Sequence, residues 1–206
     1  MSSGRVLGTY RLVVALLTAL ALAVDAHQAT FTGGGLPNFF SYLTTDSNIL
    51  AVLVLGYGGF AALTGRTPFG DYLRGATVLY LTFVGAAYWL LLRNDPVAIP
   101  WVNDVVHGIT PLAVIVDWVF APPRTRLTAG RASRWLIFPI VYLFYTFIRG
   151  PIVHWYPYSF ISPYENNYLA VVATVAALLV GVALLMLVVM WAGNALERRT
   201  EPQLVD

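Results

Sequence analysis

Two polar side chains within long apolar stretches could together perform nucleophilic chemistry. Thr44 carries a hydroxyl and His107 an imidazole, and each lies near the start of a mainly hydrophobic segment. A hydroxyl becomes an effective nucleophile when a base lies within hydrogen-bond reach and a third group orients that base. Asp104 or Asn103, about one helical turn before His107, could be the orienting group. These residue types suit the hydrolysis of a lipid ester.

Helical spacing predicts further polar neighbours for both residues. Side chains three or four positions apart lie on the same side of a helix. Ser47 and Asn48 have that spacing from Thr44. The corresponding set on the second helix is Asn103, Asp104, His107 and Thr110.

Two more roles can be assigned by residue type. Asn48, Arg149 or Tyr145 could stabilise negative charge on a reacting ester oxygen. The side chains expected to line the substrate pocket are Ser47, Tyr88 and Tyr145.

Each of these residues also has a structural interpretation. A threonine in a membrane helix is often a small packing residue bonded to its own backbone, and a histidine can form one interhelical hydrogen bond. Asp117 could be the partner of an arginine or of a helix terminus. Aromatic residues near a membrane boundary usually form an interfacial belt, as expected for Trp155, Tyr156 and Tyr158. The alternative function is therefore a non-enzymatic protein that binds or transports a lipid or small molecule in an outer-leaflet polar pocket.

The elements that must position these residues are membrane-spanning helices. The chain has 206 residues, of which 58% are hydrophobic and 11% charged, against roughly 25% charged in soluble domains. Because a spanning helix needs about 20 apolar residues, we expect an all-α, polytopic bundle of six helices in a single domain, residues 1–206. The predicted spans are 10–26, 39–63, 76–92, 98–121, 135–150 and 167–194, followed by a short tail from about residue 195.

Arginine placement predicts the direction of these spans. All twelve cations are arginines; ten fall between the spans on one side, and only Arg93 and Arg149 fall on the other. By the positive-inside rule, both termini are expected in the cytoplasm and the protein in the plasma (inner) membrane. Thr44 then lies roughly 7–8 Å and His107 roughly 9–13 Å below the outer surface. A cleaved secretory signal ending near His27 is the alternative for the first span.

Composition argues against several other functions. Without cysteine, there can be no thiol catalysis or thiolate metal site. The three histidines, His27, His107 and His154, offer neither a haem ligand pair in the membrane core nor a convincing zinc site. We therefore expect no metal and no cofactor. The expected partners are membrane lipids, with a lipid ester as a possible substrate and no nucleic acid.

Several motifs make the chain resemble a known family. They are the run FSYLTTDSN at 40–48, NDVVH at 103–107 followed by Pro111 and Asp117-Trp118, and YTFIRG at 145–150 followed by WYPY at 155–158. Over nearly its whole length the chain resembles the androgen-induced and androgen-dependent membrane protein family, and most closely its bacterial branch. The resemblance implies a hydrolase of fatty acid esters of hydroxy fatty acids, with Thr44 as the threonine and His107 as the histidine. Ser47-Asn48, Asp117-Trp118 and the Arg149 loop resemble the bacterial branch only, which implies a different substrate or no catalysis.

Overall fold

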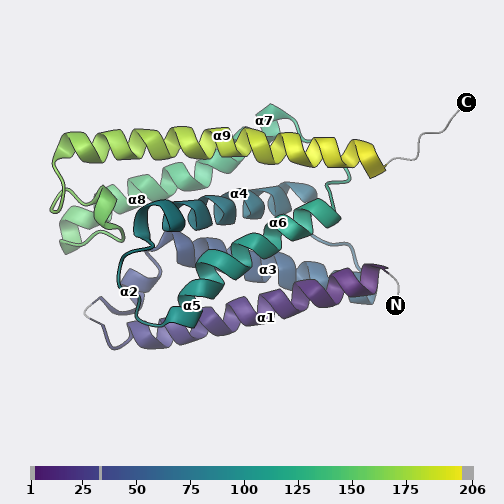
Figure 1. The fold of residues 1–206 in the computed structure, drawn as a ribbon, viewed down its shortest axis with the longest axis horizontal. Coiled ribbons are helices and arrows are strands. Elements are labelled where there is room, and N and C mark those ends of the chain that lie inside the picture. The colour runs from purple at the N-terminus through teal and green to yellow at the C-terminus, as the bar shows by residue number, and fades with distance from the viewer. Residues whose placement is uncertain (1–2, 33, 201–206) are drawn as a thin grey trace, which may run out of the picture.

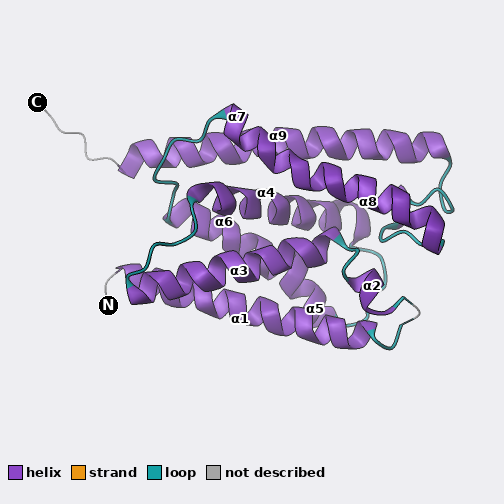
Figure 2. Cartoon of the chain, turned by 180° about the vertical axis from the view of Figure 1, so that it is seen from behind, coloured by secondary structure: helices purple, strands orange, loops and turns teal. Residues whose placement is uncertain are grey.

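The long apolar runs form helices, because a segment in lipid must satisfy its backbone hydrogen bonds internally. The computed structural model describes residues 3–32 and 34–200, and for residues 3 and 198–200 it describes the backbone alone. Every regular element in these ranges is helical, as Figure 2 shows. The predicted all-α fold class is confirmed.

Six helical stretches in the described ranges are long and apolar enough to cross a membrane, as predicted. Three of them contain short turns of a different helical type, which the labels separate. The elements are α1 (Ser3–Ala29); α3 (Leu43–Thr64); α4 (Asp71–Ala87) with the π-helical turn η1 (Tyr88–Leu92); α5 (Pro100–Asp104), the π-helical turn η2 (Val105–Ile109) and α6 (Thr110–Phe120); α7 (Ala129–Ala132), the 3₁₀ turn η3 (Ser133–Leu136) and α8 (Ile137–Val153); and α9 (Tyr168–Thr200).

Several predicted boundaries need correction. The third and fifth spans, expected to be short, extend over 22 and 25 residues as Asp71–Leu92 and Ala129–Val153. The second begins at Leu43 and not at residue 39, because the chain first forms the short helix α2 (Gly35–Phe39). The tail expected from about residue 195 lies partly outside the described residues, since α9 continues to Thr200.

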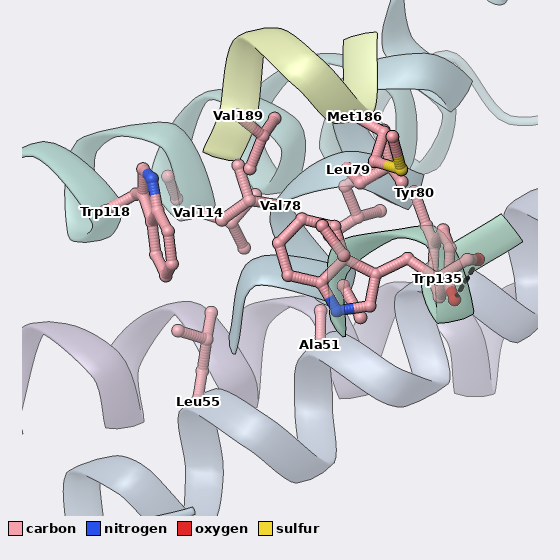
Figure 3. Packing of buried hydrophobic residues seen from close by; sticks show 14 of the residues in the cluster. Ala51, Leu55, Val78, Leu79, Tyr80, Val114, Trp118, Trp135, Met186 and Val189 are labelled. Carbon is pink, nitrogen blue, oxygen red and sulfur yellow. Dashed lines mark hydrogen bonds between the residues drawn. The ribbon is translucent and has the colours of Figure 1, made fainter. Parts of the chain in front are cut away.

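Helix α4 forms the centre of the bundle. In Figure 1 it lies between the pair α1 and α3 and the pair α8 and α9. It is the most buried of the six stretches and α9 is the least buried. Leu79 and Leu81 of α4 are fully buried, and Figure 3 shows the surrounding cluster with Trp118 of α6, Trp135 of η3 and Met186 of α9.

Helices α1 and α3 pack side by side through small residues (Figures 1 and 2). A methyl group added to Gly59 would lie 2.7 Å from the Gly8 carbonyl oxygen and 2.8 Å from the Leu12 side chain. Small residues of this kind allow close backbone approach between membrane helices. The contact fixes the position of α3, whose first turn carries Thr44.

The two ends of the bundle differ in charge. The start of α1 and the end of α9 lie at the same end (Figure 1). Alternation of the spans brings to that end the arginines of the α1 start and of the two connections 65–70 and 121–128. We call this the arginine-rich end. Arg93 and Arg149 follow or end spans that run the other way, and we call their end the arginine-poor end.

A buried charge network holds three helices together near the arginine-rich end. Asp117 of α6 accepts hydrogen bonds from Arg11 Nε of α1 at 2.6 Å and from Arg74 Nη2 of α4 at 2.9 Å. Arg74 also donates to the Ala121 carbonyl at 2.6 Å and pairs with Asp71 at 3.1 Å. Asp117 is thus the arginine partner that one sequence interpretation anticipated.

Candidate active site

Thr44 lies in the first turn of α3, where backbone N–H groups have no partner inside the helix. Tyr42, two residues before Thr44, caps the helix and has an extended backbone, with φ −87° and ψ 129°. The Thr44 N–H donates to the Tyr158 hydroxyl at 3.3 Å. The Thr44 side-chain Oγ1 lies 3.3 Å from His107 Nε2 and 3.4 Å from the Tyr158 hydroxyl. Three distant parts of the chain therefore meet at one threonine.

The environment of Thr44 differs from that of a packing threonine. The hydroxyls of Thr18, Thr64 and Thr77 each donate to the carbonyl four residues earlier in their own helix. Among the described residues, the Thr44 hydroxyl has only His107 and Tyr158 as hydrogen-bond partners. The self-bonded arrangement expected for a structural threonine is absent at this position.

His107 is presented by a π-helical turn and supported by a second one. It belongs to η2, and its ring stacks on Tyr88 of η1 with a centroid distance of 4.2 Å and an interplanar angle of 19°. Asn103 Nδ2 donates to the Tyr88 hydroxyl at 2.7 Å and so holds the stacked ring. Single π-helical turns inside α-helices are frequent at functional sites. Both π-helical turns in the described chain thus contribute to the position of the His107 ring.

The two ring nitrogens of His107 have different surroundings. Nε2 faces the Thr44 hydroxyl. Nδ1 is buried and has no well-aligned hydrogen-bond partner within the described structure. The backbone carbonyl of Asn103, four residues earlier in the chain, interacts with the ring. A proton on Nδ1 would leave the Nε2 lone pair directed at Thr44, which is the form that a general base needs.

Asp104 does not take part in this arrangement. It is exposed, and in the described chain no hydrogen bond or ion pair joins it to His107. Asn103, Asp104 and His107 all line one surface cavity, but in the described structure the Asp104 carboxylate makes no hydrogen bond to the His107 ring. Asn103 reaches the imidazole indirectly, through Tyr88.

Asn48 and Ser47 are fully buried but not in the expected roles. Asn48 Nδ2 donates to the Thr44 carbonyl at 2.9 Å and to the Val106 carbonyl at 3.1 Å. Both amide hydrogens are used, so Asn48 joins α3 to η2 and has none left for an oxyanion. Ser47 does not line the cavity beside Thr44.

Tyr145 and Arg149 lie away from Thr44. The Tyr145 hydroxyl bonds to Ser41 Oγ at 2.8 Å, and Arg149 Nη2 donates to Asn38 Oδ1 at 2.6 Å. Neither side chain lines the Thr44 cavity. Tyr142, one turn earlier on α8, faces that cavity instead, because the rotation of α8 about its axis directs Tyr145 and Arg149 elsewhere.

A narrow cavity adjoins Thr44 and His107. Its volume is about 60 Å³. The lining residues that carry polar groups are Thr44, Tyr88, His107, Tyr142 and Tyr158, and the remaining ones are aliphatic or aromatic. Three of its lining residues, Leu143, Leu179 and Val182, also line an apolar groove of about 600 Å³ between α8 and α9. The cavity therefore adjoins this groove, with the three side chains at their common boundary, and the groove faces the bilayer if the six helices span it.

Tyr158 is the site residue that sequence reasoning assigned to an interfacial belt. It lies between α8 and α9, just before the 3₁₀ turn η4 (Ser159–Ile161), and its ring stacks on Phe160 at 5.2 Å. Removal from water raises the pKa of the Tyr158 phenol to about 12. The phenol stays protonated near neutral pH and can donate a hydrogen bond. No local feature of the WYPY run distinguishes it from its neighbours, since only the return of the connection over α3 brings it to Thr44.

The described residues contain no group of three or more His, Asp or Glu side chains that could hold a metal ion. Comparisons with protein-family models, with curated proteins and with solved structures each find no match. The resemblance to the androgen-induced family thus stays a prediction. Fold and site together define an all-α protein with six potential membrane spans and a Thr–His–Tyr cluster at a buried cavity.

Proposed function

We propose that this chain is an integral membrane lipid-ester hydrolase in which Thr44 is the nucleophile and His107 the general base. The observation that carries the proposal is the 3.3 Å contact between Thr44 Oγ1 and His107 Nε2 beside an apolar cavity. A base must lie within such reach of the proton that it removes. Fatty acid esters of hydroxy fatty acids, or similar lipids, are the proposed substrates.

The reaction follows from these contacts. Thr44 Oγ1 attacks the ester carbonyl carbon while His107 Nε2 takes the hydroxyl proton. The negative charge that develops on the carbonyl oxygen accepts a hydrogen bond from Tyr158, near the positive N-terminal end of α3. The carbon–oxygen bond to the alcohol then breaks, and His107 returns its proton to the departing oxygen. Water activated by His107 finally hydrolyses the acyl-threonine and releases the fatty acid.

The cavity dimensions bear on how a lipid would enter. Ligand pockets usually measure roughly 300–1,000 Å³, far more than the 60 Å³ beside Thr44. The groove between α8 and α9 supplies the missing space for an acyl chain. Entry from the side, directly out of the bilayer, keeps that chain in an apolar environment throughout.

The proposed location follows from the arginine distribution. With the arginine-rich end in the cytoplasm, both termini are cytoplasmic and Thr44 lies in the outer third of a bacterial plasma membrane. The site would then meet lipids of the outer leaflet.

The direct experiment uses purified full-length protein in lipid nanodiscs. We expect it to hydrolyse a fatty acid ester of a hydroxy fatty acid and to react with a fluorophosphonate probe, with the label at Thr44 by peptide mass spectrometry. Absence of turnover over a panel of lipid esters, together with absence of labelling at Thr44, would overturn the proposal.

The Tyr158→Phe substitution tests the proposed oxyanion donor. We expect kcat to fall about 100-fold with little change in KM, because loss of one such donor typically costs 10²–10³ in rate. Steady-state kinetics with the same ester give the measurement. Tyr156→Phe is the matched control, since Tyr156 belongs to the same connection but contacts Tyr164 and Phe147. Equal kcat for Tyr158→Phe and the unmodified protein would exclude this role.

The Leu179→Trp substitution tests the groove as the acyl-chain path. Leu179 lines both the cavity and the groove, so the larger ring should obstruct their junction. We expect at least a tenfold loss of kcat/KM for long-chain esters and a smaller loss for short-chain esters, measured with a series of chain lengths. Leu187→Trp, on the same helix and exposed, is the control. An equal loss for all chain lengths would argue against the path.

Lipid binding without catalysis is the second candidate function. The apolar groove between α8 and α9 favours it, because the groove could hold an acyl chain whether or not Thr44 reacts. Tight binding of a fatty acid together with no turnover of its esters would support this function over hydrolysis.

A further inference from the structure

We propose that a second cavity, around Arg149, binds the anionic head group of the lipid substrate, a carboxylate or a phosphate. This inference rests on the proposed hydrolase function and specifies its substrate class. The cavity lies at the arginine-poor end and measures about 700 Å³, against about 60 Å³ for the cavity beside Thr44. Its polar lining residues are Asp25, Gln28, Thr32, Asn38, Tyr42 and Arg149, with Trp155.

Arg149 is a cation without a counter-ion in the described chain. The ion pairs there involve Arg11 and Arg74, and no carboxylate lies within 4.0 Å of the Arg149 nitrogens. The side chain is half-buried at the end of α8. A cation in this position, with partial access to water, attracts an anion strongly because the surroundings screen charge poorly.

Two contacts hold the Arg149 guanidinium in place. Nη2 donates to Asn38 Oδ1 at 2.6 Å, and the guanidinium carbon lies 5.3 Å from the Trp155 ring centroid. A guanidinium has five N–H groups, and among the described residues only this one has a side-chain acceptor. The remaining donors can form the paired hydrogen bonds that carboxylates and phosphates accept.

The local backbone supports this placement. A methyl group added to Gly34 would collide with the Asn38 side-chain amide. Residue 34 therefore must stay small if Asn38 is to hold Arg149. Asn38 is directly followed by Phe39, which is buried against α1.

An aromatic wall lies between this cavity and the Thr44 site. Tyr42 lines the Arg149 cavity, and its ring meets Trp155 and Tyr158 edge-on, each at a centroid distance of 5.6 Å. Tyr158 lines the other cavity and contacts Thr44. These rings therefore lie between the two cavities, and a lipid whose head group binds Arg149 has to extend past them for its ester to reach Thr44. This arrangement selects an ester that carries a separate anionic group.

Asp25 is the other charged group that lines this cavity, and we expect its charge to affect anion binding as well. It lies on α1, is half-buried, and is not within ion-pair distance of Arg149. Its negative charge would oppose an incoming anion and would favour a cation. Removing the charge at 25 and removing the charge at 149 should thus act in opposite directions on anion binding.

The experiment measures binding in the full-length Thr44→Ala protein, so that hydrolysis plays no part. A fluorescent fatty acid and its methyl ester are titrated into nanodiscs of zwitterionic lipid, and lysophosphatidic acid serves as the phosphate probe in competition. Arg149→Gln should weaken binding of the acid about tenfold or more, since a charge-assisted hydrogen bond contributes about that factor. Binding of the methyl ester should not change. Asp25→Asn should tighten binding of the acid, and Arg149→Lys should keep part of the affinity.

The control is Arg93→Gln, which removes the other arginine at the same end. It should leave both affinities unchanged. Equal loss for acid and methyl ester, or unchanged acid binding in Arg149→Gln, would overturn the proposal, and so would weaker anion binding in Asp25→Asn. Competition by lysophosphatidic acid but not by fatty acid would assign the site to phosphate head groups. Because the Thr44→Ala background is inactive by design, a protein without hydrolase activity can still pass this test, and an active hydrolase can still fail it.

Discussion

Thr44→Ala and His107→Ala should each lower kcat/KM for a lipid ester by a factor of about a thousand or more. Thr44 would lose the attacking oxygen and His107 the group that takes its proton, and residues that act as one catalytic unit give losses of this size. The 3.3 Å contact between Oγ1 and Nε2 means that neither residue can be replaced by a neighbour. The double variant should be no less active than either single variant. Hydrolysis rates in nanodiscs, with fluorophosphonate labelling alongside, provide the measurement.

Two further variants make this result specific. Thr45→Ala removes the adjacent hydroxyl, which is buried and does not line the cavity, and it should retain activity within a few-fold. Thr44→Ser keeps a hydroxyl at the same position and should restore part of the rate. Full turnover by Thr44→Ala would exclude Thr44 as the nucleophile. If Thr45→Ala lost activity while Thr44→Ala kept it, the nucleophile would be Thr45 and not Thr44.

Asp117→Asn should destabilise the folded bundle by about 3–5 kcal/mol, because it leaves two buried guanidinium groups without their shared counter-ion. The Arg11 and Asp117 side chains are only 7% and 6% exposed, so water cannot replace the lost carboxylate. The interaction joins α1, α4 and α6, and its loss should separate the helices at the arginine-rich end. Thermal unfolding in detergent, followed by tryptophan fluorescence, measures the change.

The same network provides the controls for Asp117→Asn. Asp71→Asn removes a carboxylate that pairs with Arg74 at the edge of the network and should cost less. The double variant Arg11→Met with Asp117→Leu removes one charge of each sign and leaves Arg74 paired with Asp71, so stability should recover in part. An unchanged melting temperature for Asp117→Asn would contradict the structural role assigned here. Since the network lies at the far end from Thr44, ester hydrolysis below the unfolding temperature should persist.

The number of potential spans and a similar level for the two central residues were predicted from the sequence alone. Hydropathy is a local property, and a bilayer requires about 20 apolar residues per crossing. Arginine alternation in the connections agreed with six crossings, and the helix rise of 1.5 Å per residue placed Thr44 and His107 at similar depth. These predictions needed no knowledge of which helices touch. The structure confirms the six potential spans and brings the two side chains together.

The neighbours of the pair depended on tertiary structure. Rotation of a helix about its axis is decided by packing, so sequence spacing could not tell that Tyr142 of α8 faces the cavity while Tyr145 and Arg149 do not. Spacing placed Asn103, Asp104 and His107 beside one cavity, but only the structure shows that Asp104 is exposed and makes no hydrogen bond to His107 in the described residues.

Tyr158 illustrates the same limit for a connection between helices. Its contact with Thr44 joins residues 114 positions apart, and the path of the chain between α8 and α9 decides it. The sequence by itself determined the solvent, the crossings and the pair of residues capable of chemistry, because these depend on local composition. Only the packed bundle decided what surrounds that pair, since each neighbour comes from a different helix or connection.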